Sequence, residues 1–214
     1  KMACGDRKAR FHIAILDPSL LVSAPQRVRA DAGIDALAHV VESYVSTRRT
    51  SLSQMFARQA WQLLAPHYEA AIADPQNATA MLLGAHLAGT AIENSMLGAA
   101  HATANPLTSR YPLSHGCAVA LMLPHVIRLN GQVVDDLYGE LCADIQLNGS
   151  ALALAAYLEE LCAMAGLPRR LADCQVAASD LPAMAQEAAG QWTGTFNPLP
   201  LQEADFLRLY EIAF

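Results

Sequence analysis

Aromatic side chains, charged side chains and basic runs are all scarce in this sequence. Aromatic residues make up 6% of the 214 residues and charged residues 16%, whereas 53% are hydrophobic. Ala and Leu dominate the hydrophobic set, and a core of such strong helix formers predicts packed helices rather than a sheet sandwich. The length suits one globular domain, or one and a fraction.

Several functional classes are disfavoured by what is missing. The net charge is −6, and no Lys/Arg stripe alternates with aromatic residues, so nucleic-acid binding is not expected. No run of 18 apolar residues occurs and residues 1–10 are polar, so neither a membrane span nor a signal peptide is expected. The cysteines are odd in number and form no CxxC pair, which predicts reduced thiols in a cytoplasmic protein. They are Cys4, Cys117, Cys142, Cys162 and Cys174.

The N-terminal part differs from the rest of the chain. Residues 11–16 (FHIAIL) are apolar and β-rich, and Asp17-Pro18 ends the run, which predicts one buried strand. Because a lone strand cannot satisfy its own backbone groups, its partners are expected in a part of the protein not present here, or in another chain. The predicted fold is an all-α multi-helix bundle preceded by one orphan strand.

Helical periodicity follows the strand. Ser23 and Pro25 resemble an N-cap region, Ser114 is a predicted N-cap, and Gly166 is a predicted helix stop. Asn105-Pro106 and Tyr111-Pro112 are expected to break the chain into a turn. Helices are predicted near residues 25–45, 51–68, 77–97, 114–130, 133–145, 150–165, 179–190 and 206–213.

Histidine and aspartate carry the most specific chemistry. Asp35 and His39 are four residues apart, which on a helix places them one turn apart on one face, where both can reach one cation. Such a pair alone is more often joined by a hydrogen bond, or unrelated, than a metal site. His101 and His115 flank the proline-rich segment, and two helix ends returning to one place would bring their imidazoles together. Alternatively, either histidine simply bonds a carbonyl or favours a helix dipole.

Two long stretches resemble the signatures of one family. AILDPSLLVSAPQRVRADAGIDALAHVVE contains Asp35 and His39, and GAAHATANPLTSRYPLSHGCAVALMLPHV contains His101 and His115. Both resemble, in collinear order and spacing, the signatures of the iron-containing (group III) alcohol dehydrogenases. FNPLPLQEADFLRLY, near the C-terminus, also looks like the closing segment of that family.

The resemblance implies a metal site and a reaction. Carried over position by position, the metal ligands are Asp35, His39, His101 and His115, a set that suits Fe(II) and equally Zn(II), Mn(II) or Co(II). The family's helical domain is dehydroquinate synthase-like, and its metal polarises the oxygen of a small alcohol or aldehyde for hydride transfer with NAD(P). Self-association as a homo-oligomer is also compatible with this assignment.

The sequence departs from the family pattern at three places. Asn105 stands where many relatives have a further histidine near the nicotinamide, so a proton relay there is in doubt, although Asn105 remains a candidate cofactor contact. Ala32 stands where a hydroxyl residue is usual. No two glycines are adjacent, so the Gly-rich phosphate loop of the cofactor domain is missing.

Residues 1–18 are therefore expected to be the remnant strand and linker of an absent dinucleotide-binding domain, and residues 19–214 the metal-binding domain.

Other polar residues receive structural interpretations. Glu42 either orients the His39 imidazole or lies on a polar face, and the second interpretation is preferred slightly. Cys117 is expected to be a small buried residue rather than a ligand. His12, His67, His86 and His125 are expected to be structural or exposed, and Trp192 and Phe196 to pack in the core.

Two rival hypotheses remain open. One is a non-catalytic helical remnant that acts as a metal-binding or interaction module, its uncovered apolar surface buried by a partner or by self-association. The other is a sugar- or polyol-processing relative with zinc at a similar site. The dehydrogenase hypothesis expects four protein ligands and one open position that faces a cleft.

Overall fold

The computed structural model describes residue 8 and residues 11–214. In this part of the chain the regular structure is helical, which confirms the predicted fold class. The α-helices are α1 (Gln26–Val45), α2 (Ser51–Leu64), α3 (Tyr68–Ala73), α4 (Ala78–Glu93), α5 (Ala99–Arg110), α6 (His115–Asp144), α7 (Ala151–Met164), α8 (Leu181–Ala189) and α9 (Glu203–Ala213). A short 3-10 turn, η2 (Pro18–Leu21), precedes α1, and others connect later helices, including η7 (Trp192–Phe196) between α8 and α9.

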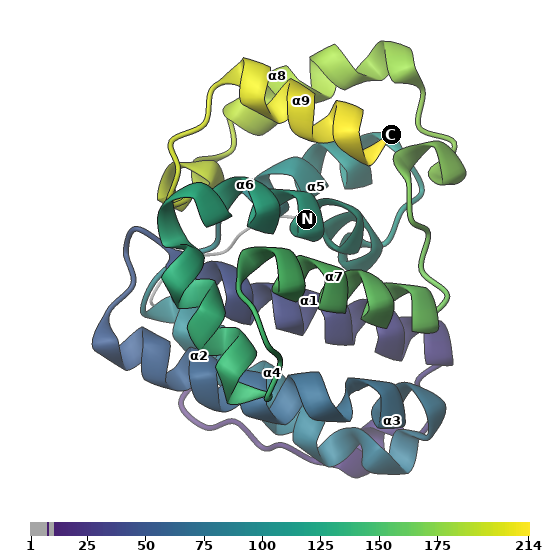
Figure 1. The fold of residues 1–214 in the computed structure, drawn as a ribbon. Helices are drawn as coiled ribbons and strands as arrows, with labels where there is room; N and C mark the ends of the chain where they lie inside the picture. Colours follow the sequence, from purple (N-terminus) through teal and green to yellow (C-terminus); the bar gives the residue numbers. More distant parts are fainter. Residues whose placement is uncertain (1–7, 9–10) are drawn as a thin grey trace.

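Helix α1 runs through the middle of the bundle. It packs against α2 and α4 on one side and against α6 on another, while α8 and α9 pack on each other at the end of the molecule away from α2, α3 and α4 (Figure 1). From Ala30 onward most of its residues are buried. Small residues allow this close packing, since a Cβ on Gly33 would lie 2.6 Å from Cε2 of Tyr68. A helix buried on nearly all sides explains why its sequence shows so little amphipathic pattern.

Helix α6 begins and bends where the sequence indicates. The side chain of Ser114 accepts a hydrogen bond from the amide of Cys117, so Ser114 is the N-cap as predicted. Val134 has non-helical backbone angles (φ −135°, ψ 29°), which separates the two helices predicted at 114–130 and 133–145. The helix is long and apolar enough to span a membrane, but 61% of its most apolar window is buried inside the protein, as in the core helix of a bundle.

One local prediction is wrong, and another concerns a strand whose expected partners lie outside the described chain. Residues 11–16 form no strand and are exposed, with Ile15 86% accessible. The described part of the chain contains no sheet to which this apolar segment could pair, so its backbone cannot be satisfied as a strand. Asn105-Pro106 does not form a turn either, because α5 continues through Pro106 to Arg110. Proline costs this helix one backbone hydrogen bond, but Pro106 and Leu107 are buried, and their packing favours the continuous helix.

Candidate metal centre

The first two members of the site come from one face of α1. Asp35 and His39 are one helical turn apart, and Asp35 Oδ1 lies 3.5 Å from His39 Nε2. Both side chains are about one-fifth exposed, so they are reachable from the surface of the bundle. The i, i+4 spacing therefore does bring the two side chains together, as predicted.

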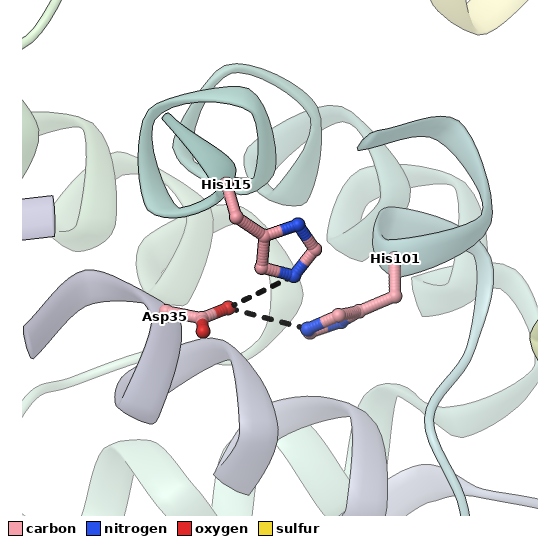
Figure 2. A group of neighbouring side chains, drawn as sticks. All are labelled: Asp35, His101 and His115. Atoms are coloured by element: carbon pink, nitrogen blue, oxygen red, sulfur yellow. Dashed lines mark ion pairs between the residues drawn. The ribbon is translucent and has the colours of Figure 1, made fainter. Parts of the chain in front are cut away.

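Two further imidazoles reach the same carboxylate from α5 and α6. His101 is in the first turn of α5 and His115 is the first residue of α6. Their Nε2 atoms lie 3.2 Å and 3.6 Å from Asp35 Oδ1, respectively (Figure 2). One ligand atom from each of Asp35, His101 and His115 lies within 4.8 Å of the others. The His39 ring stacks on His101 with 5.0 Å between centroids, at the edge of this group of three.

The convergent atoms have the chemistry of a cation site. Asp35 Oδ1 and His101 Nε2 are buried, yet neither has a hydrogen-bond partner among the described residues. Buried polar atoms without partners are costly unless an ion or water occupies the space between them. A carboxylate oxygen together with imidazole nitrogens suits Fe(II), Zn(II), Mn(II) or Co(II). The residues present therefore fit a divalent transition-metal ion.

Glu42 supports His101 from behind. Its side chain is 3% exposed, and its Oε2 lies 2.6 Å from His101 Nδ1. Its Oε1 accepts a hydrogen bond of 2.6 Å from the amide of Ala100. The preferred sequence interpretation of Glu42 as a polar-face residue is wrong, and the imidazole it contacts belongs to His101 rather than to His39. The sequence indicated His39 because it lies three residues before Glu42. The observed partner, His101, is 59 residues away and is brought close by helix packing.

The start of α6 is held against α1 at very short range. A Cβ on Gly116 would lie 1.9 Å from the backbone oxygen of Asp31, so only glycine allows this approach. The Ser114 hydroxyl also donates a hydrogen bond of 2.7 Å to Asp31 Oδ2. Asp31 precedes Asp35 by one turn of α1, and His115 lies between Ser114 and Gly116 at the start of α6. This contact therefore sets the distance between the Asp35 carboxylate and the His115 imidazole.

The charges in the group shift two pKa values. Burial raises the pKa of Asp35, but the close contact with His101 and the nearby imidazoles of His39, His101 and His115 outweigh it and hold that pKa well below its ordinary value. Burial lowers the pKa of His101, whereas its contacts with Asp35 and Glu42 outweigh that effect and raise it to about 9. The site is therefore an anionic carboxylate surrounded by imidazoles that it attracts.

Comparison with known proteins assigns the chain to a family. A sequence model described as "Fe-containing alcohol dehydrogenase family, C-terminal" matches residues 29–214. The chain belongs to the iron-containing alcohol dehydrogenase family. Both of the signature stretches that carry the resemblance overlap the matched region.

Similar proteins of this family act on alcohols and aldehydes, as their names state. Long-chain-alcohol dehydrogenase 1 of Geobacillus thermodenitrificans is 35% identical, and the match covers 94% of this chain and 54% of that protein. Lactaldehyde reductase of Escherichia coli (strain K12) is 30% identical over 100% of this chain and 58% of that protein. A crystal structure of a 1,3-propanediol oxidoreductase superposes with a TM-score of 0.89 at 31% identity, covering 92% of this chain and 55% of that one. The chain thus spans about half the length of these iron-containing alcohol dehydrogenases.

Asn105 lines a cavity beside the candidate metal site. It lies on α5 one turn beyond His101, and its Nδ2 donates a hydrogen bond of 2.9 Å to Gln191 Oε1. His115 opens onto the same polar cavity of about 420 Å³. The cavity is lined by Asn105, Pro106, Thr108, Ser109, His115, Glu187 and Gln191. Sequence reasoning singled out Asn105 but missed Gln191, which has no distinguishing motif.

The remaining sequence candidates lie outside the group of donors. Cys117 is buried, as expected, and burial raises its pKa to about 12. His67 is exposed and bonds the Leu63 carbonyl oxygen at 2.9 Å, which agrees with its structural interpretation. Trp192 is half exposed and makes an edge contact with Phe196, so its predicted core position is wrong. His12 is exposed.

Proposed function

We propose that this chain is the metal-binding helical half of an NAD(P)-dependent alcohol dehydrogenase, with Asp35, His39, His101 and His115 as the ligands of one divalent cation. The observation that carries the proposal is the convergence of buried donor atoms from α1, α5 and α6 within 4.8 Å. Membership of the iron-containing alcohol dehydrogenase family supports the reaction class.

Each side chain has a distinct part in the proposed site. Asp35 supplies the negative charge to which the three imidazole Nε2 atoms are directed, at 3.2 to 3.6 Å. A bound divalent cation would supply Lewis-acid polarisation of an alcohol or carbonyl oxygen, so that hydride exchange with a nicotinamide is favoured. His115 lines the polar cavity that also contains Asn105, which makes this cavity the proposed approach for substrate and nicotinamide.

The dinucleotide is proposed to bind mainly outside this span. The sequence has no pair of adjacent glycines for a phosphate loop, and the relatives are nearly twice as long as the matched region. Residues 1–18 would then connect the helical domain 19–214 to the dinucleotide-binding part. Relatives include both an NAD-dependent methanol dehydrogenase and an NADPH-dependent butanol dehydrogenase, so the proposed cofactor is NAD or NADP.

Metal content is the decisive measurement for this proposal. We expect about one equivalent of iron or zinc in the purified chain, measured by elemental analysis after incubation with the metal and desalting. His115→Ala should lose this metal, whereas His67→Ala, the same substitution at an exposed histidine, should retain it. If the wild-type chain holds no stoichiometric metal, the ligand assignment is wrong and the interaction-module hypothesis replaces it.

Activity of the isolated chain is a separate test. Without a dinucleotide-binding part, the 214-residue chain should show little or no NAD(P)-dependent oxidation of simple alcohols, monitored by nicotinamide absorbance. Turnover at ordinary enzymatic rates would contradict the proposed division of labour between the two parts.

A further inference from the structure

Glu42 is a buried carboxylate with two short contacts to consecutive residues of α5. Oε1 lies 2.6 Å from the Ala100 amide nitrogen, and Oε2 lies 2.6 Å from Nδ1 of His101. The side chain is 3% exposed, so water cannot replace either contact. A charged group this deeply buried requires partners for both oxygens.

Both partners of Glu42 must donate if His101 is to bind a cation. The Ala100 amide is a donor by its chemistry. The Nε2 atom of His101 points to Asp35 Oδ1, at 3.2 Å (Figure 2), and only an unprotonated Nε2 presents a lone pair to a metal ion. A neutral imidazole then carries its proton on Nδ1, which donates to Glu42. A glutamate side chain accepts at both oxygens, whereas glutamine has one acceptor and one donor.

The same carboxylate also fixes the start of the helix that carries His101. The N-cap residue of α5 is Gly98, which has no side chain to cap the first amides. Acceptors from other elements replace it, with Asn197 Oδ1 3.3 Å from the Ala99 amide and Glu42 next to it on Ala100. A Cβ on Gly98 would lie 3.0 Å from Glu42 Oε1. Glu42 therefore holds the start of α5 together with Asn197, and it alone contacts the Nδ1 atom of the His101 ring.

We propose that Glu42 is a positioning residue that selects the Nδ1-protonated form of His101, so that Nε2 is directed at the cation. The inference rests on the proposed metal site and adds to it the residue that orients one ligand. Glu42 does not itself face the donor group. It acts through His101, in the way that outer-shell carboxylates orient metal-bound imidazoles in proteins.

Glu42→Gln is a nearly isosteric test of this role. If the amide oxygen of the substituted side chain accepts from Ala100, its NH₂ group faces Nδ1 of His101 and favours the form protonated on Nε2, which opposes metal binding. If the amide is reversed, two donors meet at Ala100. In either orientation Co(II) affinity, measured by competition with a chromophoric chelator, should fall by roughly 10–100-fold, and the visible Co(II) spectrum should change.

Asn197→Ala serves as the matched structural control. It removes the other acceptor at the start of α5 and leaves the contact between Glu42 and His101 in place. We expect it to lower thermal stability while largely preserving Co(II) affinity and the shape of the Co(II) spectrum. If Asn197→Ala weakens Co(II) binding as much as Glu42→Gln does, Glu42 only holds the helix and the proposed selection of the ring form is wrong.

A direct measurement on the wild-type chain keeps the test independent of variant folding. In the Zn(II)-loaded protein, long-range ¹H–¹⁵N correlation spectra should show His101 protonated on Nδ1 and metal-bound through Nε2. Binding through Nδ1, or unchanged affinity in Glu42→Gln, would overturn the inference while the metal site stands. Failure of the wild-type chain to bind either Co(II) or Zn(II) would instead overturn the proposed function.

Discussion

Replacing Gly116 by alanine tests how the contact between α1 and α6 controls both stability and the donor group. The added Cβ would lie 1.9 Å from the backbone oxygen of Asp31, 2.5 Å from its carbonyl carbon and 2.9 Å from its Cα. Ordinary van der Waals contacts of a Cβ begin near 3.4 Å. The two helices must therefore separate by about 1.5 Å at this point, and no flexible side chain can absorb the change.

The expected cost follows from that displacement. Overpacking of a close-packed interior typically costs about 1–3 kcal/mol, and a clash with backbone atoms belongs at or above the upper end, about 3 kcal/mol. For a domain of this size that corresponds to a decrease in Tm of about 6–12 °C. Because His115 precedes Gly116 directly, the same shift should lengthen the 3.6 Å separation between His115 Nε2 and Asp35 Oδ1 and weaken metal binding.

Gly89→Ala is the matched control. A Cβ at Gly89 on α4 meets no atom within 4 Å, so this substitution should stabilise the chain by up to about 1 kcal/mol through helix propensity. Both variants are compared with wild type by urea unfolding followed by circular dichroism, and by metal analysis. A Gly116→Ala chain as stable as wild type, with unchanged metal content, would refute the argument that this contact sets the geometry of the site.

Three further predictions concern the rest of the chain. Removing a bound cation with a chelator should lower the free energy of unfolding by about 2.7 kcal/mol relative to protein at a free-cation concentration of about 100 times Kd, and an unchanged Tm would contradict this. Burial, and then the positive charge of Arg128, lower the pKa of His125 despite the opposing charge of Glu159. The folded chain thus favours neutral His125 more than the unfolded chain does. This contribution to the free energy of unfolding is fully present above the ordinary pKa near 6.5 and is lost as the pH falls below that value. His125→Gln should flatten the decline in urea midpoint between about pH 7.5 and pH 5.5, and an equal decline in both proteins would exclude this cause. Tyr210→Phe removes a buried hydrogen bond of 2.6 Å to the Thr103 carbonyl and should cost about 1 kcal/mol in chemical unfolding, with no effect on metal content.

The sequence alone was sufficient where local chemistry decides the outcome. Ser114 caps α6 because a serine side chain can accept from amides of the first helical turn. Gly166 follows the end of α7 with φ +68°, a conformation that glycine adopts without cost. The i, i+4 spacing of Asp35 and His39 likewise followed from helix geometry, and the family signatures pointed to all four candidate ligands.

Local rules failed where distant segments compete. Proline in Asn105-Pro106 predicts a turn, but packing of α5 against α6 and α8 keeps the helix continuous. The apolar residues 11–16 satisfy the pattern of a buried strand, but strand formation requires a neighbouring strand, which the described chain does not supply. Packing between helices decides the first case, and the lack of a partner strand in the described chain decides the second.

The sequence therefore pointed to the four candidate ligands through the family signatures, but not to the contacts of Glu42 and Gln191, which follow from helix packing. The convergence of the ligands was decided only by the tertiary structure. The 3.2 Å approach of His101 to Asp35 depends on the contact between Glu42 and His101, which are 59 positions apart. The 3.6 Å approach of His115 to Asp35 depends on the contact of Gly116 with Asp31, which are 85 positions apart. Short-range spacing carries no information about such pairs, since helix packing alone brings their atoms within bonding distance.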